Sequence, residues 1–321
     1  MGLMPFFTFT IDGKSIGGSI SVAIHDEVGA KADSITATIA DPNGLALWPI
    51  IKDKKCKATI GYLDGSQATF GDYKLNEVSY DYGAYQFTLT GHAVDFSKEA
   101  KAKKTRTLED ITLEDLVAKC ASEMSLKPRV SDDLKSIFFT AISQTNETNL
   151  NFLVRLAKDY GAVAKVGNDH LLFIERGKGK NASGEDLPEV IITIADLLVG
   201  SKITERERKK YKSVKAFYYD AKAGKKLNEK AGKGEPELAL KKTYPNKQSA
   251  KAAAKAELNN KKRETYVLEA IIEGRPDIIA ETPITTIGIK TPTNGKWIVQ
   301  SVDHTVDGGG FVTTFTAEQK I

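Results

Sequence analysis

The sequence predicts a mainly β protein in which two related antiparallel β-barrel domains flank a small α+β domain. Three observations carry this prediction. Apolar residues alternate with polar ones over most of residues 6–92 and again from 190 to 316, and helical apolar spacing occurs between these regions. Turn-forming pairs such as Asp64-Gly65 separate the alternating runs. We therefore expect three domains, at 1–100, 101–182 and 183–321.

The first β region contains six short alternating runs. Because neighbouring side chains of a strand point to opposite faces, each run can bury one face. The runs lie at 7–11, 20–24, 35–39, 58–62, 73–75 and 87–89. Residues 45–51, after the turn Asp41-Pro42-Asn43-Gly44, are expected to form a loop or a short helix. Many short strands joined by turns favour an antiparallel barrel or sandwich.

The middle region is organised around a helix expected at 150–160. At about 100° per residue its apolar side chains cover one broad arc, which indicates a helix buried over more than half its girth. Thr145 or Asn146 can cap its start, where the helix dipole also favours Glu147. Gly161 can adopt the left-handed conformation that ends a helix. Both ends of the helix are thus specified locally, and its polar groups are interpreted as caps.

A hairpin, a second helix and one further strand are expected around this helix. The hairpin pairs 162–166 with 170–175, and the strand lies at 137–142. The second helix begins at the capping-box sequence Thr112-Leu113-Glu114-Asp115. The Lys-rich run at 98–106 is predicted to be a linker.

The third region returns to strand patterns and contains the one charge anomaly of the chain. The strands are expected near 190–194, 214–218, 266–272, 285–289, 297–302 and 311–316. Between them, residues 222–263 hold thirteen Lys or Arg against four Glu. We expect a mobile glycine-rich loop in the first part of this basic insertion (around 220–263) and a helix at 247–263. The insertion is either a docking surface for an acidic partner or nucleic acid, or a solvated face. Since Tyr244 is its one aromatic residue, base stacking is not indicated and the solvated face is favoured.

The two β regions share a weak internal repeat. The repeat aligns 59–62, 71–75, 78–83 and 87–90 with 286–289, 295–299, 302–308 and 313–316. We interpret this as two copies of one domain, of which the second carries the basic insertion. The alternative is that any two β-hairpins can be aligned this well with small gaps. A different strand order in the two regions would exclude duplication.

The composition excludes several classes of protein. Lys and Arg number 46 against 42 Asp and Glu, so the formal charge of +4 gives no case for specific nucleic-acid or anionic-membrane binding. No apolar run approaches the roughly 18 residues of a membrane span, and the start does not resemble a signal peptide. Cys56 and Cys120 show no paired spacing, which favours a reduced, cytosolic folding compartment. A soluble protein without a disulfide is expected.

The histidines do not form a convincing catalytic constellation. His25, His92, His170 and His304 all lack metal-ligand spacing. Asp303-His304 with Ser301 invites a catalytic triad, but neighbouring strand residues point to opposite faces and the sequence has no nucleophile elbow. A histidine at the strand surface is expected instead.

Glycine-rich and acidic segments also have structural explanations. Gly177-x-Gly179 lacks a dinucleotide-binding context, and Gly308-Gly309-Gly310 is expected to form a hairpin turn. Four carboxylates lie at an expected helix start, where the dipole favours them. They are Glu109, Asp110, Glu114 and Asp115. We therefore nominate no catalytic, cofactor-binding or metal-binding residue, and expect no enzyme and no cofactor.

The segment 144–175 also carries a family resemblance. Its sequence Gln-x-Asn-Glu-Thr-x-Leu-x-Phe-Leu-x-Arg-Leu-Ala-x-x-Tyr-Gly-Ala, followed by the Leu171-Leu172-Phe173 hairpin, resembles the late control protein D family. This family comprises the baseplate hub proteins of contractile-tailed phages, and the segment is also similar to the hub portion of type VI secretion spike proteins. Further matching segments at 104–113, 268–276 and 295–315 extend the resemblance over most of the chain.

The resemblance implies a structural, non-enzymatic hub with tube-like β-barrel domains. It implies a homotrimer that joins the sixfold tail tube protein to the trimeric spike protein, beside other baseplate proteins. Three chains with two similar barrels each would present six near-equivalent units. Such a protein would be made in the host cytoplasm and reside in the tail baseplate of the virion.

Two rival classes remain from the sequence. One is a cell-wall or carbohydrate-binding tail module that uses the middle domain, and the other is a tail-associated hydrolase. Gene control through DNA is not expected, because the sequence has no helix-turn-helix pattern with basic recognition residues.

Overall fold

The computed structural model describes residues 4–29, 33–44, 46, 48–49, 54–93, 102–167, 170–180, 185–207, 210–220, 223–290 and 294–320. The chain divides into two compact units. Unit 1 comprises Met1–Asp95, Leu187–Ile203 and Leu268–Ala317, and unit 2 comprises Phe96–Asp186, Thr204–Val267 and Glu318–Ile321. The borders expected near 100 and 182 lie outside the described residues, so the division into three domains stays a prediction.

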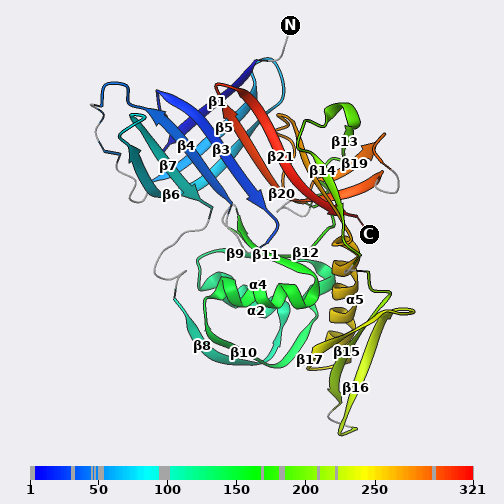
Figure 1. Cartoon of the computed structure of the whole chain (residues 1–321). Coiled ribbons are helices and arrows are strands. Elements are labelled where there is room, and N and C mark those ends of the chain that lie inside the picture. Colours follow the sequence, from blue (N-terminus) through cyan, green and yellow to red (C-terminus); the bar gives the residue numbers. More distant parts are fainter. Residues whose placement is uncertain are drawn as a thin grey trace. The chain divides into compact units, whose positions relative to one another are not determined.

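Unit 1 is built from a sheet of thirteen strands, which fall into two halves along the chain (Figure 1). The first half contains β1 (Pro5–Ile11), β2 (Lys14–Ser15), β3 (Ser19–Glu27), β4 (Ser34–Ala40), β5 (Lys55–Tyr62), β6 (Gln67–Asp81) and β7 (Gln86–His92). The second half contains β13 (Val190–Thr193), β14 (Lys202–Glu205), β18 (Tyr266–Glu273), β19 (Pro283–Ile287), β20 (Gly295–Asp307) and β21 (Gly310–Gln319). The mainly β prediction is confirmed. Most residues of the predicted loop or helix at 45–51 lie outside the described part of the chain.

The two halves have the same strand order. Neighbouring strands of the first half follow the order β3-β4-β7-β6-β5-β1, and those of the second half follow β14-β18-β21-β20-β19-β13. The halves differ in the direction of one strand: β1 runs antiparallel to β5, whereas its counterpart β13 runs parallel to β19. The shared order is the result that a duplication predicts and supports the internal repeat.

The predicted closure into two barrels is wrong. In the described residues the sheet runs as an open path from β14 to β2. The early part of β20 pairs with β19, but its residues 301–306 pair antiparallel with 22–27 of β3. We call this pairing of 22–27 with 301–306 the seam. Because β20 takes a partner from the first half, the two halves form one continuous sheet.

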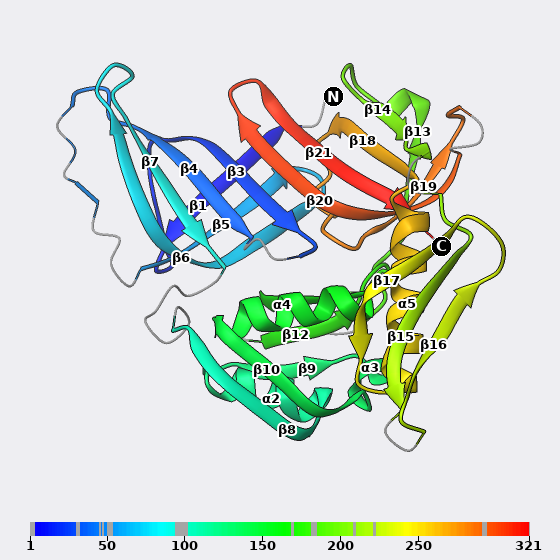
Figure 2. The same cartoon turned by 60° about the horizontal axis from the view of Figure 1, so that its bottom comes forward.

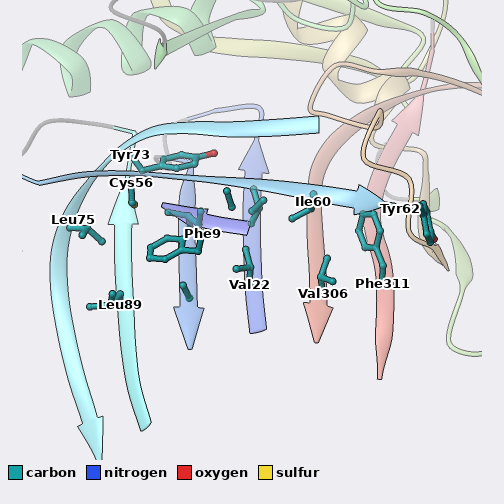
Figure 3. Packing of buried hydrophobic residues seen from close by; sticks show 14 residues of the cluster. Phe9, Val22, Cys56, Ile60, Tyr62, Tyr73, Leu75, Leu89, Val306 and Phe311 are labelled. Carbon is teal, nitrogen blue, oxygen red and sulfur yellow. The ribbon is translucent and has the colours of Figure 1, made fainter. Parts of the chain in front are cut away.

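The core of the first half contains side chains from both halves (Figure 3). Phe9, Val22, Ile60 and Leu89 come from the first half and are almost completely buried. Phe311 of the second half packs in the same cluster, with its ring centroid 5.6 Å from that of Tyr62. The hydrophobic effect therefore favours the joined sheet over separate halves.

Unit 2 contains three small sheets. A two-stranded sheet pairs β8 (Lys104–Thr112) with β10 (Phe138–Glu147), and a second joins β11 (Ala162–Gly167), β12 (His170–Glu175) and β9 (Lys127–Val130). Their helices are α2 (Leu113–Ser122), α3 (Asp132–Lys135) and α4 (Asn149–Tyr160). The third sheet has the order β16-β15-β17, formed by Lys225–Gly232, Ser213–Asp220 and Glu237–Tyr244.

The helix predicted at 150–160 is confirmed as α4. Its cap differs from the prediction: Thr148, rather than Thr145 or Asn146, accepts a hydrogen bond from the Asn151 amide at 3.2 Å. Gly161 ends the helix with φ of 62°, as expected. The hairpin of β11 and β12 and the capping of α2 by Thr112 are also confirmed.

Two stretches predicted to lack regular structure form strands. Of the predicted linker 98–106, residues 98–101 lie outside the described part, and residues 104–106 begin β8. Lys104 and Arg106 alternate with threonines in β8, so charged side chains share one face where they find acidic partners. The predicted loop at 222–236 contains β16, whose alternate residues are half-buried.

The helix predicted at 247–263 is confirmed as α5 (Lys247–Arg263) and lies along the β16-β15-β17 sheet (Figure 2). Its small apolar residues pack against the sheet, which lets the helix approach closely. These buried residues include Ala250, Ala253, Ala254 and Leu258. Their packing partners on β15 include Val214, Ala216 and Tyr218.

We expect Gly274→Ala to destabilise unit 1 by about 1 to 3 kcal/mol, because it overpacks a closed site. A Cβ at Gly274 would lie 2.0 Å from Cγ of Phe311. The backbone cannot shift freely, since the Gly274 amide donates to the Phe311 carbonyl at 2.9 Å and its carbonyl accepts from the Tyr62 hydroxyl at 3.1 Å. Denaturant unfolding measures the change. Gly308→Ala is the control, because a Cβ there meets nothing within 4 Å; equal stability of both variants would contradict the prediction.

Candidate interaction surfaces

Neither metal-binding clusters nor membrane helices occur in the described part of the chain. No group of three or more His, Cys, Asp or Glu there could hold a metal ion. No helix among these residues combines the length and apolarity that a membrane span requires. Cys56 and Cys120 are free and buried, and burial raises the pKa of their thiols to about 12 and about 11. Both thiols therefore remain protonated near neutral pH and react slowly.

His304 does not form a triad with its neighbours in the sequence. The expected strand-surface histidine is wrong, because this face of β20 packs inside unit 1 and buries the ring completely. Its Nε2 lies 2.9 Å from the Ile278 carbonyl, and its Nδ1 lies 3.0 Å from Oγ1 of Thr313. Burial lowers the pKa of His304, so the ring is neutral. Asp303 lies on the other face of the strand and contacts His25 instead.

The other segments considered for chemistry have structural roles. Gly308 and Gly309 form the turn between β20 and β21, as predicted. The amide of Asp115 donates to the capping hydroxyl of Thr112 at 3.1 Å. Gly177 lies in the turn after β12.

A histidine between two carboxylates lies across the seam. His25 stands directly opposite Asp303, with 2.7 Å between Nδ1 and Oδ1, and its Nε2 lies 3.2 Å from Glu27 Oε2. Burial alone would lower the pKa of His25, but the hydrogen bond and charge of Asp303, followed by those of Glu27, raise it overall. Because both ring nitrogens face carboxylates, the site suits a charged imidazolium. This ion pair joins the first half to the second.

A partly buried polar network holds the family-like motif in unit 2. Glu123, at the end of α2, accepts from Nη1 and Nη2 of Arg106 at 2.6 and 3.0 Å and from Lys104 at 2.6 Å. Nδ2 of Asn149 donates to the same carboxylate at 2.9 Å, and Nε of Arg106 donates to Gln144 Oε1 at 2.8 Å. Gln144 and Asn149 are almost completely buried. The Arg106 hydrogen bonds, above all, lower the pKa of Glu123 to about 2.

These contacts give the polar residues of the motif structural roles. Gln144 and Asn149 belong to the Glu123 network, and Thr148 caps α4. Glu147 accepts two hydrogen bonds from Arg155, at 3.2 and 2.6 Å. Such a network orders two strands and two helices around a single carboxylate.

Two groups of exposed apolar residues occur in unit 1. The first, which we call the aromatic patch, lies around the β6–β7 turn and comprises the exposed Trp48, Tyr82 and Tyr85 together with the half-buried Tyr80. Tyr82 is 78% exposed and Trp48 58% exposed. The second, the aliphatic patch, lies on and after β13 and on β19, and comprises Ile191, Ile194, Leu198, Val199 and Ile287. Val199 is fully exposed. Clustered exposed apolar side chains are typical of interaction sites.

The basic insertion presents lysines along one side of α5. Lys247, Lys251, Lys255 and Lys262 are exposed opposite the packed alanines. Lys247 lies 3.6 Å from Glu229. This arrangement is that of a helix with one packed and one solvated face, which is the favoured interpretation; docking of an acidic partner or nucleic acid is the alternative and stays untested.

Two phage proteins match this chain along nearly its whole length. They are the probable baseplate hub proteins of Escherichia phage 186 and Escherichia phage P2. Each is 25% identical, over 99% of this chain and 94% of its own length. The chain is thus similar to probable phage baseplate hub proteins. No family model matches it.

Solved structures of a prophage tail protein and a type VI secretion component share the fold. The 43 kDa tail protein of prophage MuSo2 from Shewanella oneidensis superposes with a TM-score of 0.68, at 15% identity, over 98% of both chains. A type VI secretion component from E. coli superposes with a TM-score of 0.61, at 11% identity, over 96% of this chain and 76% of its own. At these identities the likeness concerns the fold alone.

The seam and the two apolar patches are the features that sequence reasoning missed. The repeat indicated two similar halves, but pairing between a strand of one half and a strand of the other leaves no periodic signal. The patches were hidden because their members alternate like core residues, as in Tyr80 and Tyr82 of the β6 region.

We expect His25 to make unit 1 more stable at mildly acidic than at alkaline pH. A raised folded-state pKa gives stabilisation that is complete below the unfolded pKa of about 6.5 and is lost as pH rises through the folded pKa. The difference in unfolding free energy between the wild type and His25→Gln should therefore shrink as pH increases from about 6 to 9. His92 and His304 are present in both proteins, so their contributions to the pH dependence cancel in the difference of unfolding free energies. A difference independent of pH would contradict the prediction.

We expect Glu123→Gln to destabilise unit 2 by about 2 to 3 kcal/mol at neutral pH, because Arg106 and Lys104 lose their half-buried, charged partner. The folded-state pKa of Glu123 is depressed, so its contribution is present above the unfolded pKa of about 4.5 and is lost as pH falls towards the folded value. Unfolding in denaturant at several pH values measures both effects. The exposed Glu109→Gln on β8 is the matched control; equal losses in the two variants would contradict the role of the network.

Proposed function

We propose that this chain is a structural baseplate hub that forms a homotrimer and joins the tail tube to the central spike of a contractile tail or tail-like particle. The observation that carries the proposal is the match to two probable baseplate hub proteins along 99% of the chain. The fold shared with phage tail and type VI secretion proteins agrees with it.

The repeated strand order supplies a physical reason for a trimer. A tube ring with sixfold symmetry and a spike with threefold symmetry can be matched by a trimer whose chains each carry two similar halves. The two halves of unit 1 have the same strand order and belong to one chain, so three chains offer six similar half-sheets. We infer that these sheets face the tube protein and that the trimer as a whole receives the spike.

The proposed role is structural rather than enzymatic. His304, the residue that most invited a catalytic interpretation, is buried and hydrogen bonded to Ile278 and Thr313. Other baseplate proteins are further partners on this proposal. The protein would be made and assembled in the host cytoplasm and reside in the virion baseplate.

We expect the purified chain to be a trimer in solution, alone or after addition of the trimeric spike protein from the same genome. Light scattering coupled to size exclusion gives the mass, and co-elution with spike and tube proteins tests the contacts. Incubation with peptidoglycan sacculi serves as a control, because a wall-binding module would sediment without other tail proteins. A monomer that binds neither spike nor tube protein would overturn the hub assignment.

A further inference from the structure

The β16-β15-β17 sheet of unit 2 has one face that α5 covers and one that it does not (Figure 2). Alternate residues of β15, among them Val214 and Ala216, pack in one cluster with the alanines of α5. Because neighbouring side chains of a strand point to opposite faces, Lys215, Phe217 and Tyr219 lie on the other side, which we call the basic sheet face. The strand registers and this alternation add residues of the two outer strands to the face: Lys226, Asn228, Lys230, Glu237, Ala239, Lys241 and Thr243.

Two contacts show that side chains of all three strands meet on this face. The Glu237 carboxylate of β17 lies 2.5 Å from Nζ of Lys215 and 2.5 Å from Nζ of Lys230. Nζ of Lys226 lies 4.6 Å from the centroid of the Phe217 ring, which is the geometry of a cation–π contact. Lysines and aromatic rings are therefore neighbours on one surface.

The basic sheet face carries a local excess of positive charge. Two of its four lysines share Glu237, whereas Lys226 and Lys241 have no acidic partner in the described part of the chain. Both of these lysines are exposed, and they lie on the two outer strands, one on each side of β15. Clustered lysines favour a polyanion, because binding of each phosphate releases counterions.

Two aromatic rings of the central strand lie among these lysines. Tyr219 is 55% exposed, and Phe217 is half-buried. Since the two residues are two positions apart, their side chains lie about 7 Å apart along the strand, so each ring can take a base of its own. Stacking of a base on an aromatic side chain accepts any base, because every base has a π-face.

The sequence alone did not indicate this combination. The basic insertion begins after Tyr219, and its one aromatic residue, Tyr244, is buried in the cluster that packs against α5. Pairing of β15 with β16 and β17 brings Phe217 and Tyr219 beside lysines that come later in the chain. The fold therefore supplies the rings that the insertion lacks.

We propose that the basic sheet face binds single-stranded nucleic acid without sequence preference. Phe217 and Tyr219 stack on bases, while Lys226, Lys230 and Lys241 contact phosphates. Lys226 carries its ammonium on a flexible stem, so it moves from the Phe217 ring to a phosphate when a base arrives. An acidic peptide would use the lysines without the rings, and the bases of a duplex are already stacked on one another. This binding goes beyond the structural role proposed above and does not depend on it.

Fluorescence anisotropy with the full-length chain and a labelled oligothymidine of about ten nucleotides tests the proposal. At about 50 mM salt we expect saturable binding, with a slope of log K against log salt between about −1.4 and −2.1, which corresponds to two or three phosphates. A duplex of the same length and a polyglutamate peptide should bind at least about tenfold more weakly, since neither presents free bases. No binding of oligothymidine, or equal binding of the duplex or the peptide, would overturn the proposal.

An oligouridine of the same length is the second ligand in this experiment. It should bind within about threefold of oligothymidine, because phosphates and base faces are common to RNA and DNA. Binding of one of the two alone would contradict recognition by stacking and phosphate contacts.

Variants of Tyr219 separate stacking from simple attraction of charge. Tyr219→Leu should weaken binding of oligothymidine roughly tenfold, whereas Tyr219→Phe, which keeps the ring, should bind within about twofold of the wild type. The side chain is 55% exposed, so neither change disturbs a core. Tyr82→Leu, at a tyrosine of unit 1 that is 78% exposed, is the matched control and should leave the affinity unchanged. Equal affinities of the Leu and Phe variants at position 219 would overturn the stacking.

Glu237→Gln should increase the affinity, which a damaged fold does not do. Without the carboxylate, Lys215 and Lys230 become available to phosphates, so binding of oligothymidine should tighten about threefold and the salt slope should become steeper. An unchanged or weaker affinity of this variant would contradict binding at the basic sheet face.

Paired lysine variants locate the phosphate contacts. Lys226→Ala combined with Lys241→Ala should make the salt slope less steep by about 1.4, the contribution of two phosphates. Lys251→Ala combined with Lys255→Ala removes the same charge from the exposed side of α5 and should leave the slope unchanged. Equal slopes of the two double variants would overturn the assignment of the contacts to the basic sheet face.

Discussion

The pairing of β20 with β3 is the constraint on which unit 1 depends. A strand that continued beside β19 would leave two separate sheets, each with exposed edges and a smaller core. Because late β20 pairs with β3 rather than with β19, Val306 lies in the core of the first half, where it packs in the same cluster as Phe311 of β21. The apolar area that this buries, together with the His25 ion pair, makes the two halves one folding unit.

Unit 2 adds a charged centre to an apolar core, because α2 and α4 bury apolar side chains such as Leu116 and Phe152 and also share a network around Glu123. The Glu123 carboxylate accepts hydrogen bonds from Arg106 and Lys104 of β8 and from Asn149 of α4. Gln144 of β10 accepts a further hydrogen bond from Arg106. Glu123 is half-buried, and its partners offset the cost of removing the carboxylate from water. This explains why a motif rich in Asn, Gln, Glu and Thr identifies a fold here rather than a reaction site.

Local patterns in the sequence predicted the elements well and their partners poorly. The caps of α2, the left-handed Gly161 and the strand alternation depend on neighbours in the sequence, so they could be found there. The strand β8 escaped because its alternation is between charged residues and threonines, not between apolar and polar ones. The prediction of closed barrels was wrong because late β20 pairs with β3 rather than with β19. This pairing joins residues far apart in the chain, so no local pattern indicates it. The burial of His304 has the same origin.

Residues 204–267 leave and re-enter the sheet through β14 and β18, which are neighbouring strands. The segment is therefore an insertion, and the two neighbouring strands β14 and β18 hold both of its ends. A single proteolytic cut within it would leave both fragments held together by the strand pair at the base. Sequence changes, and even changes of length, can accumulate between these two strands while the register of the sheet around them is preserved.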